Sequence, residues 1–431
     1  MTAPPKDNAA ALARARPRLR SVGVTGTNGK TTTTSMVASI VAAAGEVAAR
    51  ATTLGTWVGD RQTSDQVTLD AFRTLVDEAV ERGVRTLAVE TTSHSLAGGF
   101  ARVWPVDVAV FTNLTRDHLN VHGSPEAYLA AKAQLFMAVP RGGAVVWNLA
   151  DPCSVLMDGL VSSEVTRLGY VVGDVHPDCA ALPVSLRATQ VQSGLEGTRF
   201  EVQADEAHQL LAGAFQLGAI GAVHVHNALA AALATAALGY APDAIRAGLA
   251  SFRGVPGRFE VLAAHPTVVV DYAHTPDALE RTLAEARALV GADGRLTCVF
   301  GCGGGRDEGK RPEMGRVADG IADDVVLTDD NPRREDPARI LDAIEAGVPA
   351  GERDARWVRI PDRRAAIRHA VERARPDDVV VIAGKGHEQV QLLASGPVAF
   401  SDHEVAREAL RDAGVESPSR RYSPPRKGND E

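Results

Sequence analysis

A stretch near the start of the chain, "GVTGTNGKTTT" at residues 23–33, has the residue types that bind a phosphate group. A short apolar strand leads into it, and Lys30 and Thr31 stand where a helix begins. At such a junction free backbone amides face an anion, a lysine neutralises its charge, and a threonine hydroxyl reaches Mg²⁺. Val24 stands where the common phosphate-loop pattern has its first glycine, so a glycine-rich turn that only begins a helix is the alternative.

A second group of polar residues follows two apolar strands. Glu90 ends one of these strands, and "TNLTRDHLNVHG" at residues 112–123 follows the other. Thr31, Glu90 and His118 together could hold Mg²⁺ beside the phosphate loop, because their side chains offer metal ligands. Taken singly, Glu90 could instead cap a helix or a turn, and His118 could be a structural histidine.

Lysine is rare in this chain, because only six of its 46 basic residues are lysine. Those that lie outside the polar tails are Lys30, Lys132, Lys310 and Lys385. A chain that otherwise uses arginine keeps lysine where an amine is needed, because only the amine can lose its proton and react. For Lys132, which lies in the helical pattern "PEAYLAAKAQLF", the alternative is a solvated surface lysine.

Polar loops also follow apolar strands in the second half of the chain. They are "DYAHTPDAL" at 271–279, "GCGGGRDEGKRPEM" at 301–314, "DDNPRREDP" at 329–337 and "AGKGHE" at 383–388. The glycine-rich loop is a second stretch that suits an anion. Arginine beside acid and amide groups suits a ligand that bears both a carboxylate and an ammonium group. Exposed, charged turns are the alternative for each loop.

The elements that position these residues alternate between strand and helix. Strands predicted near 21–25 and 86–90 show no polar alternation, which is typical of strands covered on both faces. Helical periodicity is clear at 71–83 and 225–239. The sequence therefore predicts an α/β fold with parallel sheets and crossover helices. The segment "FRGVPGRFE" at 252–260 has no clear period, and we place a domain boundary there.

Composition excludes several classes of partner. A formal net charge of -8 gives no basic surface for nucleic acid, so small-molecule substrates are expected. No apolar run approaches the roughly 18 residues that span a bilayer, and no signal peptide is evident, so no membrane contact and a cytoplasmic location are expected. The four cysteines, Cys153, Cys179, Cys298 and Cys302, form no disulfide or zinc pattern.

Together these motifs resemble those of the Mur ligases. The motifs are "TGTNGKTTT", "FTNLTRDHLNVHG", "AYLAAKAQLF", "GRFE", "DYAHTPDAL", "GCGGGRDEGKRP", "DDNPRRED" and "AGKGHE". They are most similar to the branch that adds meso-diaminopimelate to UDP-N-acetylmuramoyl-L-alanyl-D-glutamate, and the similarity covers roughly residues 20–412. The resemblance implies an ATP-dependent amide ligase, in which ATP phosphorylates a carboxylate and an amine displaces phosphate from the acyl phosphate.

The resemblance also implies a domain organisation. The expected divisions are a disordered tail at 1–18, a central P-loop ATPase domain with a mostly parallel sheet at 19–253, a smaller Rossmann-like C-terminal domain at 254–415, and a disordered tail at 416–431. ATP would be enclosed only when the two domains close, which would keep water from the acyl phosphate.

Roles for individual residues are carried over by position. The resemblance implies nucleotide binding by Gly26, Thr27, Asn28, Gly29, Lys30, Thr31, Thr32, Asn227, Arg258 and Asp271. It implies catalytic roles for Lys30, Glu90, His118 and Lys132. Two Mg²⁺ ions are expected, one on Thr31 and Glu90 and the other on His118. Lys132 matches the family's carbamylated lysine, which CO₂ converts into a carbamate that helps to hold the metal region.

Substrate-binding residues follow in the same way. The expected residues for the amine are Arg306, Asp330, Asn331, Arg333, Gly384 and Glu388. Arg333 would clamp a distal carboxylate and Glu388 a distal ammonium group. Ser93 and Arg102 could bind the carboxylate of the acyl substrate, although Arg102 needs a shift of one residue to match the family.

The acyl side departs from the family pattern, which leaves the acceptor open. The family has a UDP-binding domain before the phosphate loop, whereas only about 20 residues precede that loop here. In addition, the family's Thr-Thr-Pro motif is replaced by "DQV" at 65–67. Either a partner chain supplies the missing domain, or the chain is a stand-alone ligase that acts on a small acyl or peptidyl acceptor without UDP. A third hypothesis is a non-catalytic nucleotide-binding regulatory subunit, against which the retained Lys30 and Lys132 argue.

Overall fold

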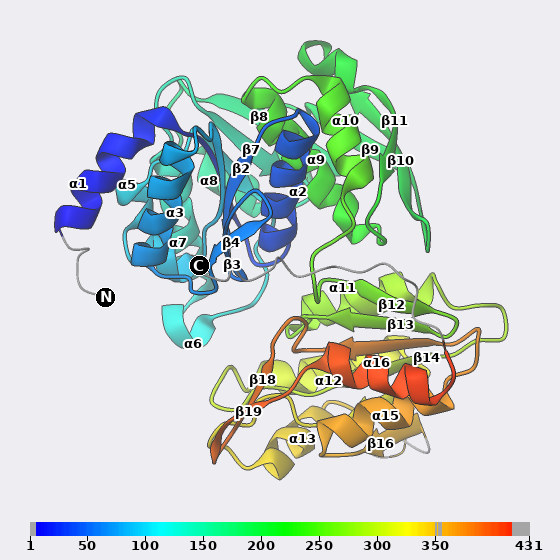
Figure 1. The fold of residues 1–431 in the computed structure, drawn as a ribbon. Coiled ribbons are helices and arrows are strands. Elements are labelled where there is room, and N and C mark those ends of the chain that lie inside the picture. The colour runs from blue at the N-terminus through cyan, green and yellow to red at the C-terminus, as the bar shows by residue number, and fades with distance from the viewer. Residues whose placement is uncertain (1–5, 350, 352–355, 416–431) are drawn as a thin grey trace.

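The computed structural model describes residues 6–349, 351 and 356–415, which form two α/β domains (Figure 1). An eleven-stranded sheet organises the central domain and a six-stranded sheet organises the C-terminal domain. The predicted junction between residues 253 and 254 lies between α10 (Pro242–Ser251) and β12 (Glu260–Ala264). The tail expected at 416–431 lies outside the described residues.

The central sheet is parallel in its middle and antiparallel at its edges. Its strands are β1 (Arg20–Thr25), β2 (Ala48–Thr52), β3 (Gly55–Val58), β4 (Arg61–Ser64), β5 (Thr86–Glu90), β6 (Val108–Phe111), β7 (Ala144–Asn148), β8 (Thr166–Val172), β9 (Leu186–Gly194), β10 (Gly197–Ala204) and β11 (Gly213–Leu217). The order is β11-β10-β9-β8-β7-β6-β1-β5-β2-β3-β4, and every pair from β9 to β2 is parallel. Strands β8 to β11 therefore extend this sheet beyond β7.

Helices cover both faces of the central sheet, as continuous apolar strands require. One face carries α2 (Lys30–Ala43), α9 (Val223–Ala237) and α10. The other carries α1 (Lys6–Ala15), α3 (Leu69–Glu81), α5 (Phe100–Val103), α7 (Pro125–Met137) and α8 (Cys153–Asp158). The remaining helices are α4 (Ser93–Ala97), α6 (Leu119–His122), η1 (Arg16–Arg18), η2 (Pro177–Cys179) and η3 (Glu206–Leu211). Along β6, Val108 and Val110 enter one core while Ala109 and Phe111 enter the other.

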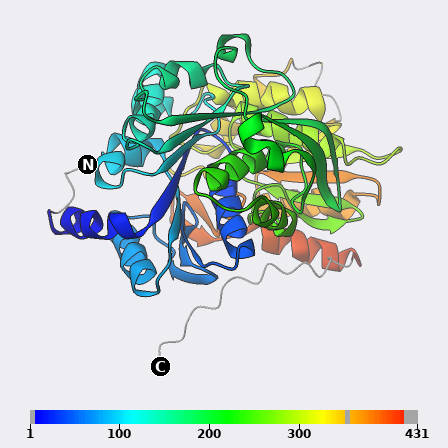
Figure 2. The same ribbon diagram turned by 90° about the horizontal axis from the view of Figure 1, so that it is seen from above.

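The N-terminal segment corrects the expected tail at residues 1–18. Residues 6–18 form α1 and η1, while residues 1–5 lie outside the described residues. Leu12 and Leu19 are fully buried in the core that also contains α3. The guanidinium of Arg16 bonds Asp107 at 2.8 Å and lies over the ring of Trp104. In Figures 1 and 2 this helix lies at the outer edge of the central domain, away from the C-terminal domain.

The C-terminal domain is a smaller sheet with helices on both faces. Its strands are β12, β13 (Thr267–Asp271), β14 (Leu296–Phe300), β15 (Asp324–Leu327), β16 (Trp357–Arg359) and β17 (Val379–Ala383), in the order β12-β13-β17-β14-β15-β16. Helices α11 (Pro276–Arg287), α12 (Lys310–Ile321) and α13 (Pro337–Glu345) cover one face, and α15 (Arg363–Arg373) and α16 (Asp402–Asp412) cover the other. A hairpin of β18 (Val390–Leu393) and β19 (Gly396–Ala399) follows β17.

Loops at the carboxyl ends of the parallel strands bring the two domains together. The side-chain Nδ2 of Asn28, which follows β1, donates to the Asp277 carboxylate of α11 at 2.9 Å. Arg116, which follows β6, pairs with Asp307, which follows β14. Open parallel sheets bind ligands at this end of their strands, so the fold directs attention to the space between these loops. No helix in the described part of the chain has the length and apolar character needed to span a membrane.

Candidate active site

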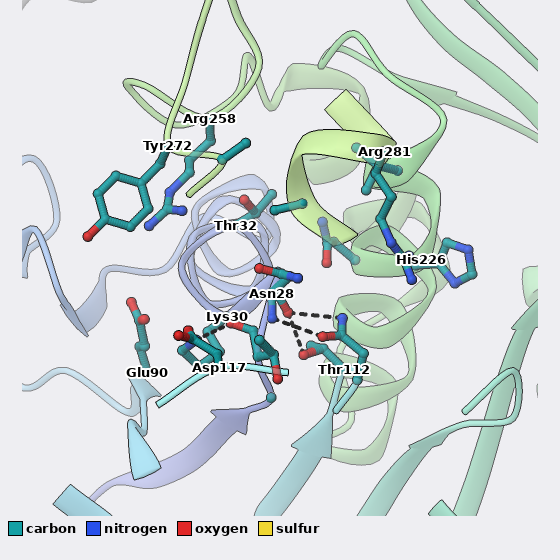
Figure 3. A pocket seen from close by; sticks show the side chains of 18 of the residues that line it. Asn28, Lys30, Thr32, Glu90, Thr112, Asp117, His226, Arg258, Tyr272 and Arg281 are labelled. Carbon is teal, nitrogen blue, oxygen red and sulfur yellow. Dashed lines mark hydrogen bonds between the residues drawn. The ribbon is translucent and has the colours of Figure 1, made fainter. Parts of the chain in front are cut away.

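A cavity of about 420 Å³ lies between the two domains (Figure 3). The predicted site residues that line it are Gly26, Thr27, Asn28, Gly29, Lys30, Thr32, Glu90, Ser93, His118, Lys132, Asn227, Arg258 and Asp271. Figure 3 shows Arg258 and Tyr272 on one side, Arg281 and His226 on the other, and Lys30 between them. Both domains are therefore needed to build this cavity.

The phosphate loop at residues 26–30 requires its two glycines. Gly26 and Gly29 have φ angles of 154° and 86°. A Cβ atom at Gly26 would lie 1.8 Å from the Thr112 hydroxyl, and one at Gly29 would lie 2.4 Å from the Asn227 amide oxygen. Gly29 caps α2 without a side-chain hydrogen bond, so the first amides of α2 receive no side-chain acceptor from the described residues. These features suit an outside anion.

Two charged residues of the central domain lie beside this loop. Burial lowers the pKa of Lys30, whose Nζ donates to the Thr27 carbonyl oxygen at 2.7 Å. One carboxylate oxygen of Glu90 accepts bonds from the Thr31 hydroxyl at 2.8 Å and from the Thr53 amide at 3.0 Å. Thr53 was not predicted from the sequence. Its hydroxyl also donates to Glu90, so it fixes the carboxylate beside Thr31.

His118 stands in a strained loop beside a carboxylate. Its φ angle is 55°, a region that few residues with a side chain adopt. Burial lowers its pKa to about 4, which leaves the imidazole neutral at pH 7. Burial alone would raise the pKa of Asp117, but bonding to His274 and nearby positive charges outweigh it and lower that pKa. A neutral imidazole can serve as a metal ligand.

Lys132 lies beneath the phosphate loop rather than on the surface. Only 1% of it is exposed, and its Nζ donates to the Gly26 carbonyl oxygen at 2.7 Å. The same nitrogen lies 4.3 Å from the centre of the Tyr128 ring. Burial, together with the charge of Lys30, lowers the pKa of Lys132 well below its ordinary value. A buried amine that loses its proton easily is the form that reacts with CO₂.

Three loops of the C-terminal half close the other side of the cavity. The Arg258 guanidinium lies 4.2 Å from the centre of the Tyr272 ring, which stacks on His387. Asp271 accepts from the Phe259 amide at 2.6 Å and from the Ala273 amide at 2.8 Å. Burial raises the pKa of Asp271. Within the described residues the buried Nε of Arg258 has no hydrogen-bond partner, which leaves a donor for a bound molecule.

Two histidines and an arginine at the far end of the cavity were not predicted. His224 and His226 lie in the first turn of α9, and Arg281 comes from α11. Burial lowers the pKa of both histidines to about 4, so both rings are neutral at pH 7. No described residue bonds the buried Nδ1 of either ring. The sequence "VHVHN" before a strong helical pattern was the available signal.

The residues expected to bind the amine form a separate cluster in the C-terminal domain and do not line the cavity. The Nζ of the fully buried Lys385 donates to Asn331 at 3.0 Å and to one oxygen of Glu388 at 2.8 Å. The side-chain Nδ2 of Asn331 donates to the same Glu388 oxygen at 2.8 Å. Glu388 is therefore held in place by one of its oxygens, while the other remains for a ligand.

Two arginines of this cluster flank a glycine. A Cβ atom at Gly303 would lie 2.9 Å from Nη1 of Arg333 and 3.7 Å from Cγ of Arg306. Arg333 has a φ angle of 55°, and its Nη1 donates to the Gly304 carbonyl oxygen at 3.0 Å. Gly384 is equally constrained, because a Cβ atom there would lie 2.5 Å from the Asp330 carboxylate. The six predicted residues thus lie on neighbouring loops of one sheet edge.

The second glycine-rich loop differs from the expected anion site. The Glu335 carboxylate accepts from the Gly305 amide at 2.9 Å and from both terminal nitrogens of Arg311, at 2.7 and 2.8 Å. An acid of the chain itself therefore occupies the place expected for an outside anion. The loop serves instead to join residues 301–311 to residues 331–335.

Of the two residues expected to bind the acyl substrate, one lines the cavity and the other does not. Ser93 lines the cavity, and its hydroxyl lies 3.0 Å from Nε2 of His122. Arg102 is exposed on α5 and is not among the residues that line the cavity. The structure therefore does not bring Arg102 to the phosphate loop.

Known proteins are similar to this chain in sequence and in fold. Residues 24–235 match the family model for the Mur ligase middle domain, and residues 257–386 match the model for the Mur ligase, glutamate ligase domain. The UDP-N-acetylmuramoyl-L-alanyl-D-glutamate--2,6-diaminopimelate ligase of Gloeobacter violaceus (strain ATCC 29082 / PCC 7421) is 41% identical over 91% of this chain and 77% of that protein. The protein of the same name from Geobacillus kaustophilus (strain HTA426) is 39% identical over 92% of this chain and 80% of that protein.

A solved structure extends the comparison to the fold. A UDP-N-acetylmuramoyl-L-alanyl-D-glutamate--2,6-diaminopimelate ligase superposes with a TM-score of 0.63 and 32% identity, over 92% of this chain and 79% of that chain. The chain belongs to the Mur ligase family. It is an ATP-dependent ligase that joins an acid to an amino acid. The predicted family and the α/β fold class are thereby confirmed.

Proposed function

We propose that the chain adds meso-diaminopimelate, or a similar diamino acid, to a UDP-muramoyl-dipeptide-like carboxylate through an acyl phosphate. The observation that carries this proposal is the presence of two separate groups of binding residues. An open phosphate loop lines the interdomain cavity, and a separate cluster of paired arginines and a held glutamate lies on the C-terminal domain. The names of the relatives support the same pair of substrates.

ATP fits the cavity by its polar atoms. Its phosphates would meet the uncapped start of α2 and Lys30, which relieves the repulsion between the γ-phosphoryl group and the attacking carboxylate. Its base and sugar would lie toward Arg258, Asp271 and Asn227. At the far end of the cavity, where α9 begins, the unpartnered ring nitrogens of His224 and His226 are further groups that a nucleotide can bond.

The donor set also fits Mg²⁺. Thr31 and Glu90 offer adjacent hard oxygens, and His118 offers a neutral imidazole. The described residues contain no ready-made group of three His, Cys, Asp or Glu side chains for a metal, so phosphate oxygens would complete the coordination. When bound, Mg²⁺ would neutralise charge on the transferring phosphoryl group. In the absence of metal, Thr53 and Thr31 hold the Glu90 carboxylate in place.

Lys132 would act as a carbamate. Its buried amine, with a pKa well below the ordinary value, favours reaction with CO₂. The product would carry a negative charge under the phosphate loop, where it would orient the cationic and metal-binding groups.

The amine cluster fits a molecule with two charged ends. Arg306 and Arg333, on either side of Gly303, would bind the distal carboxylate. The free oxygen of Glu388 would bind the distal ammonium group. Lys385 and Asn331 keep this carboxylate ionised and fixed, because both donate to its other oxygen. Asp330 and Gly384 complete the pocket wall.

A second candidate function is a stand-alone ligase for a small acyl or peptidyl acceptor. The exposure of Arg102 favours it, because that arginine does not reach the cavity where an acyl carboxylate must meet ATP. Ser93 with His122 would then carry acyl recognition. A partner chain that completes the acceptor site stays a prediction.

The deciding experiment measures ADP release from ATP and Mg²⁺ over a matrix of amines and carboxylates, with and without UDP-muramoyl dipeptide. Release that needs both diaminopimelate and UDP-muramoyl dipeptide is expected. Equal release without any amine argues against a ligase. Release with lysine but not with diaminopimelate overturns the roles of Arg333 and Glu388, and release with a small acceptor alone favours the second candidate.

A further inference from the structure

Arg116, an exposed arginine of the central domain, reaches across the domain boundary to residues 301–314. This segment carries Arg306 and is called the amine-binding loop below. Nε of Arg116 lies 3.2 Å from Oδ2 of Asp307, and its Nη1 lies 3.0 Å from Oε1 of Glu313. Its Nη2 contacts the other oxygen of Asp307 at 3.4 Å. One guanidinium thus bonds two carboxylates of the C-terminal domain, an arrangement that its planar fork favours.

The local backbone leaves room for this contact. A Cβ atom at Gly309 would lie 2.5 Å from Nη2 of Arg116, although Gly309 has an ordinary helical φ angle of -62°. A side chain at position 309 would therefore have to displace the end of Arg116 from this contact. Asp307 is itself fixed, because one of its oxygens accepts from the Gly309 amide at 3.0 Å.

The position of Arg116 in the chain joins two parts of the site. It directly precedes Asp117, which lies 3.8 Å from His274 of the C-terminal domain, and His118, which lines the cavity. Asp307 directly follows Arg306, one of the arginines expected to bind the amine. The bridge therefore ties the loop that carries His118 to the loop that carries Arg306.

We propose that Arg116 is a positioning residue that holds the amine-binding loop against the ATP site through Asp307 and Glu313. Its role in coupling ADP release to amide formation rests on the proposed function. Closure by this bridge would bring the amine to the acyl phosphate and keep water away from it. Because Arg116 is 43% exposed, the bridge is weakened by salt, whose screening length falls to ~3 Å at 1 M.

The test compares Arg116→Ala with Arg141→Ala in the full chain. Arg141 pairs with Glu164 at 2.8 Å within the central domain, so it controls for the loss of an exposed ion pair. Arg116→Ala is expected to raise the KM for the amine about fivefold and to raise the ADP released per amide formed. Arg141→Ala is expected to change neither quantity. In 0.5 M KCl, the wild type should show a higher KM for the amine and more ADP released per amide formed, as Arg116→Ala does.

A charge exchange separates the bridge from a merely structural role. Arg116→Glu alone should uncouple ADP release from amide formation, and Arg116→Glu with Glu313→Arg should restore much of the coupling. Failure of the exchange to restore coupling, or identical behaviour of Arg116→Ala and Arg141→Ala, overturns the proposal.

A second readout distinguishes this proposal from the proposed function. Small-angle X-ray scattering with a non-hydrolysable ATP analogue should give a larger radius of gyration for Arg116→Ala than for the wild type and Arg141→Ala. If the wild type forms no amide and Arg116→Ala still has a larger radius of gyration than the wild type, the bridge is supported while the proposed function is refuted. Equal radii in all three proteins overturn the bridge.

Discussion

The two glycine-rich loops have similar residue types and opposite chemistry. In the loop at 26–30, α2 begins without a side-chain cap, and the loop lines the interdomain cavity. In the loop at 303–310, the Glu335 carboxylate bonds the Gly305 amide and the Arg311 guanidinium. A loop without an internal acid is open to an outside anion, whereas a loop filled by an internal acid is a rigid support. Glycine content alone does not separate the two.

Two lysines begin the helices that follow these loops, and their replacement should separate the loops by a large difference in activity. Lys30→Met removes the charge beside the open loop and should lower ADP release roughly 100-fold or more. Lys310→Met is the matched variant, since Lys310 begins α12 and its Nζ donates to the His274 carbonyl oxygen at 2.6 Å. It should cost about tenfold or less, mainly in the KM for the amine. Steady-state ADP release measures both, and equal losses would contradict the distinction between the loops.

The second prediction concerns Lys132, whose side chain lies beneath the loop at 26–30. Lys132→Arg should abolish turnover, because a guanidinium cannot form a carbamate. Lys132→Ala should lose most activity and recover part of it when short carboxylates such as acetate are added. Full activity of Lys132→Arg would show that carbamylation plays no part, and wild-type protein with added acetate is the control.

The contacts of Glu335 with Arg311 and Gly305, called the clasp, should affect the KM for the amine and not the KM for ATP. Glu335→Gln removes the charge that bonds Arg311, so the loop that carries Arg306 should loosen and the KM for the amine should rise roughly tenfold. The KM for ATP should stay unchanged. Glu372→Gln, which breaks the Arg368 pair on the surface of α15, is the matched control. A shift in the KM for ATP alone would reverse the assignment of the two loops.

The smallest effect concerns stability against acid. Bonding to Arg311 lowers the pKa of Glu335 in the folded protein. Because the folded pKa lies below the ordinary value of about 4.3, the clasp stabilises the fold above that pH and stops doing so as the pH falls through the folded pKa. Wild type should therefore lose more stability between pH 6 and about pH 3 than Glu335→Gln does. Urea midpoints measure this, and parallel curves would contradict it.

Local patterns predicted much of the fold, including the strand and the helix on either side of residues 26–29. The strand before Gly26 and the helix after Lys30 follow from neighbouring residues, and the structure has both. Contacts between distant residues could not be read in this way. Helix α1 has only one large apolar residue, Leu12, which is buried against elements that follow much later in the chain.

The same limit explains the errors in the site. Glu335 fills a loop that lies some 30 residues earlier, and Thr53 fixes Glu90 across two strands. Neither contact has a sequence signature. Arg102 suited a carboxylate by its type and position, but the turn into α5 exposes it away from the cavity. Residue type suggested which groups could bind a ligand, whereas packing decided which of them remain free to do so.

The most direct test of the central claim follows an oxygen atom. In the proposed reaction, ATP bound at the loop of residues 26–30 phosphorylates a carboxylate before the amine attacks. With UDP-muramoyl dipeptide labelled with ¹⁸O in its reacting carboxylate, ATP, Mg²⁺ and diaminopimelate, each phosphate released should carry one ¹⁸O atom. Amide formation with phosphate that contains no ¹⁸O would contradict the acyl phosphate and the role assigned to the loop.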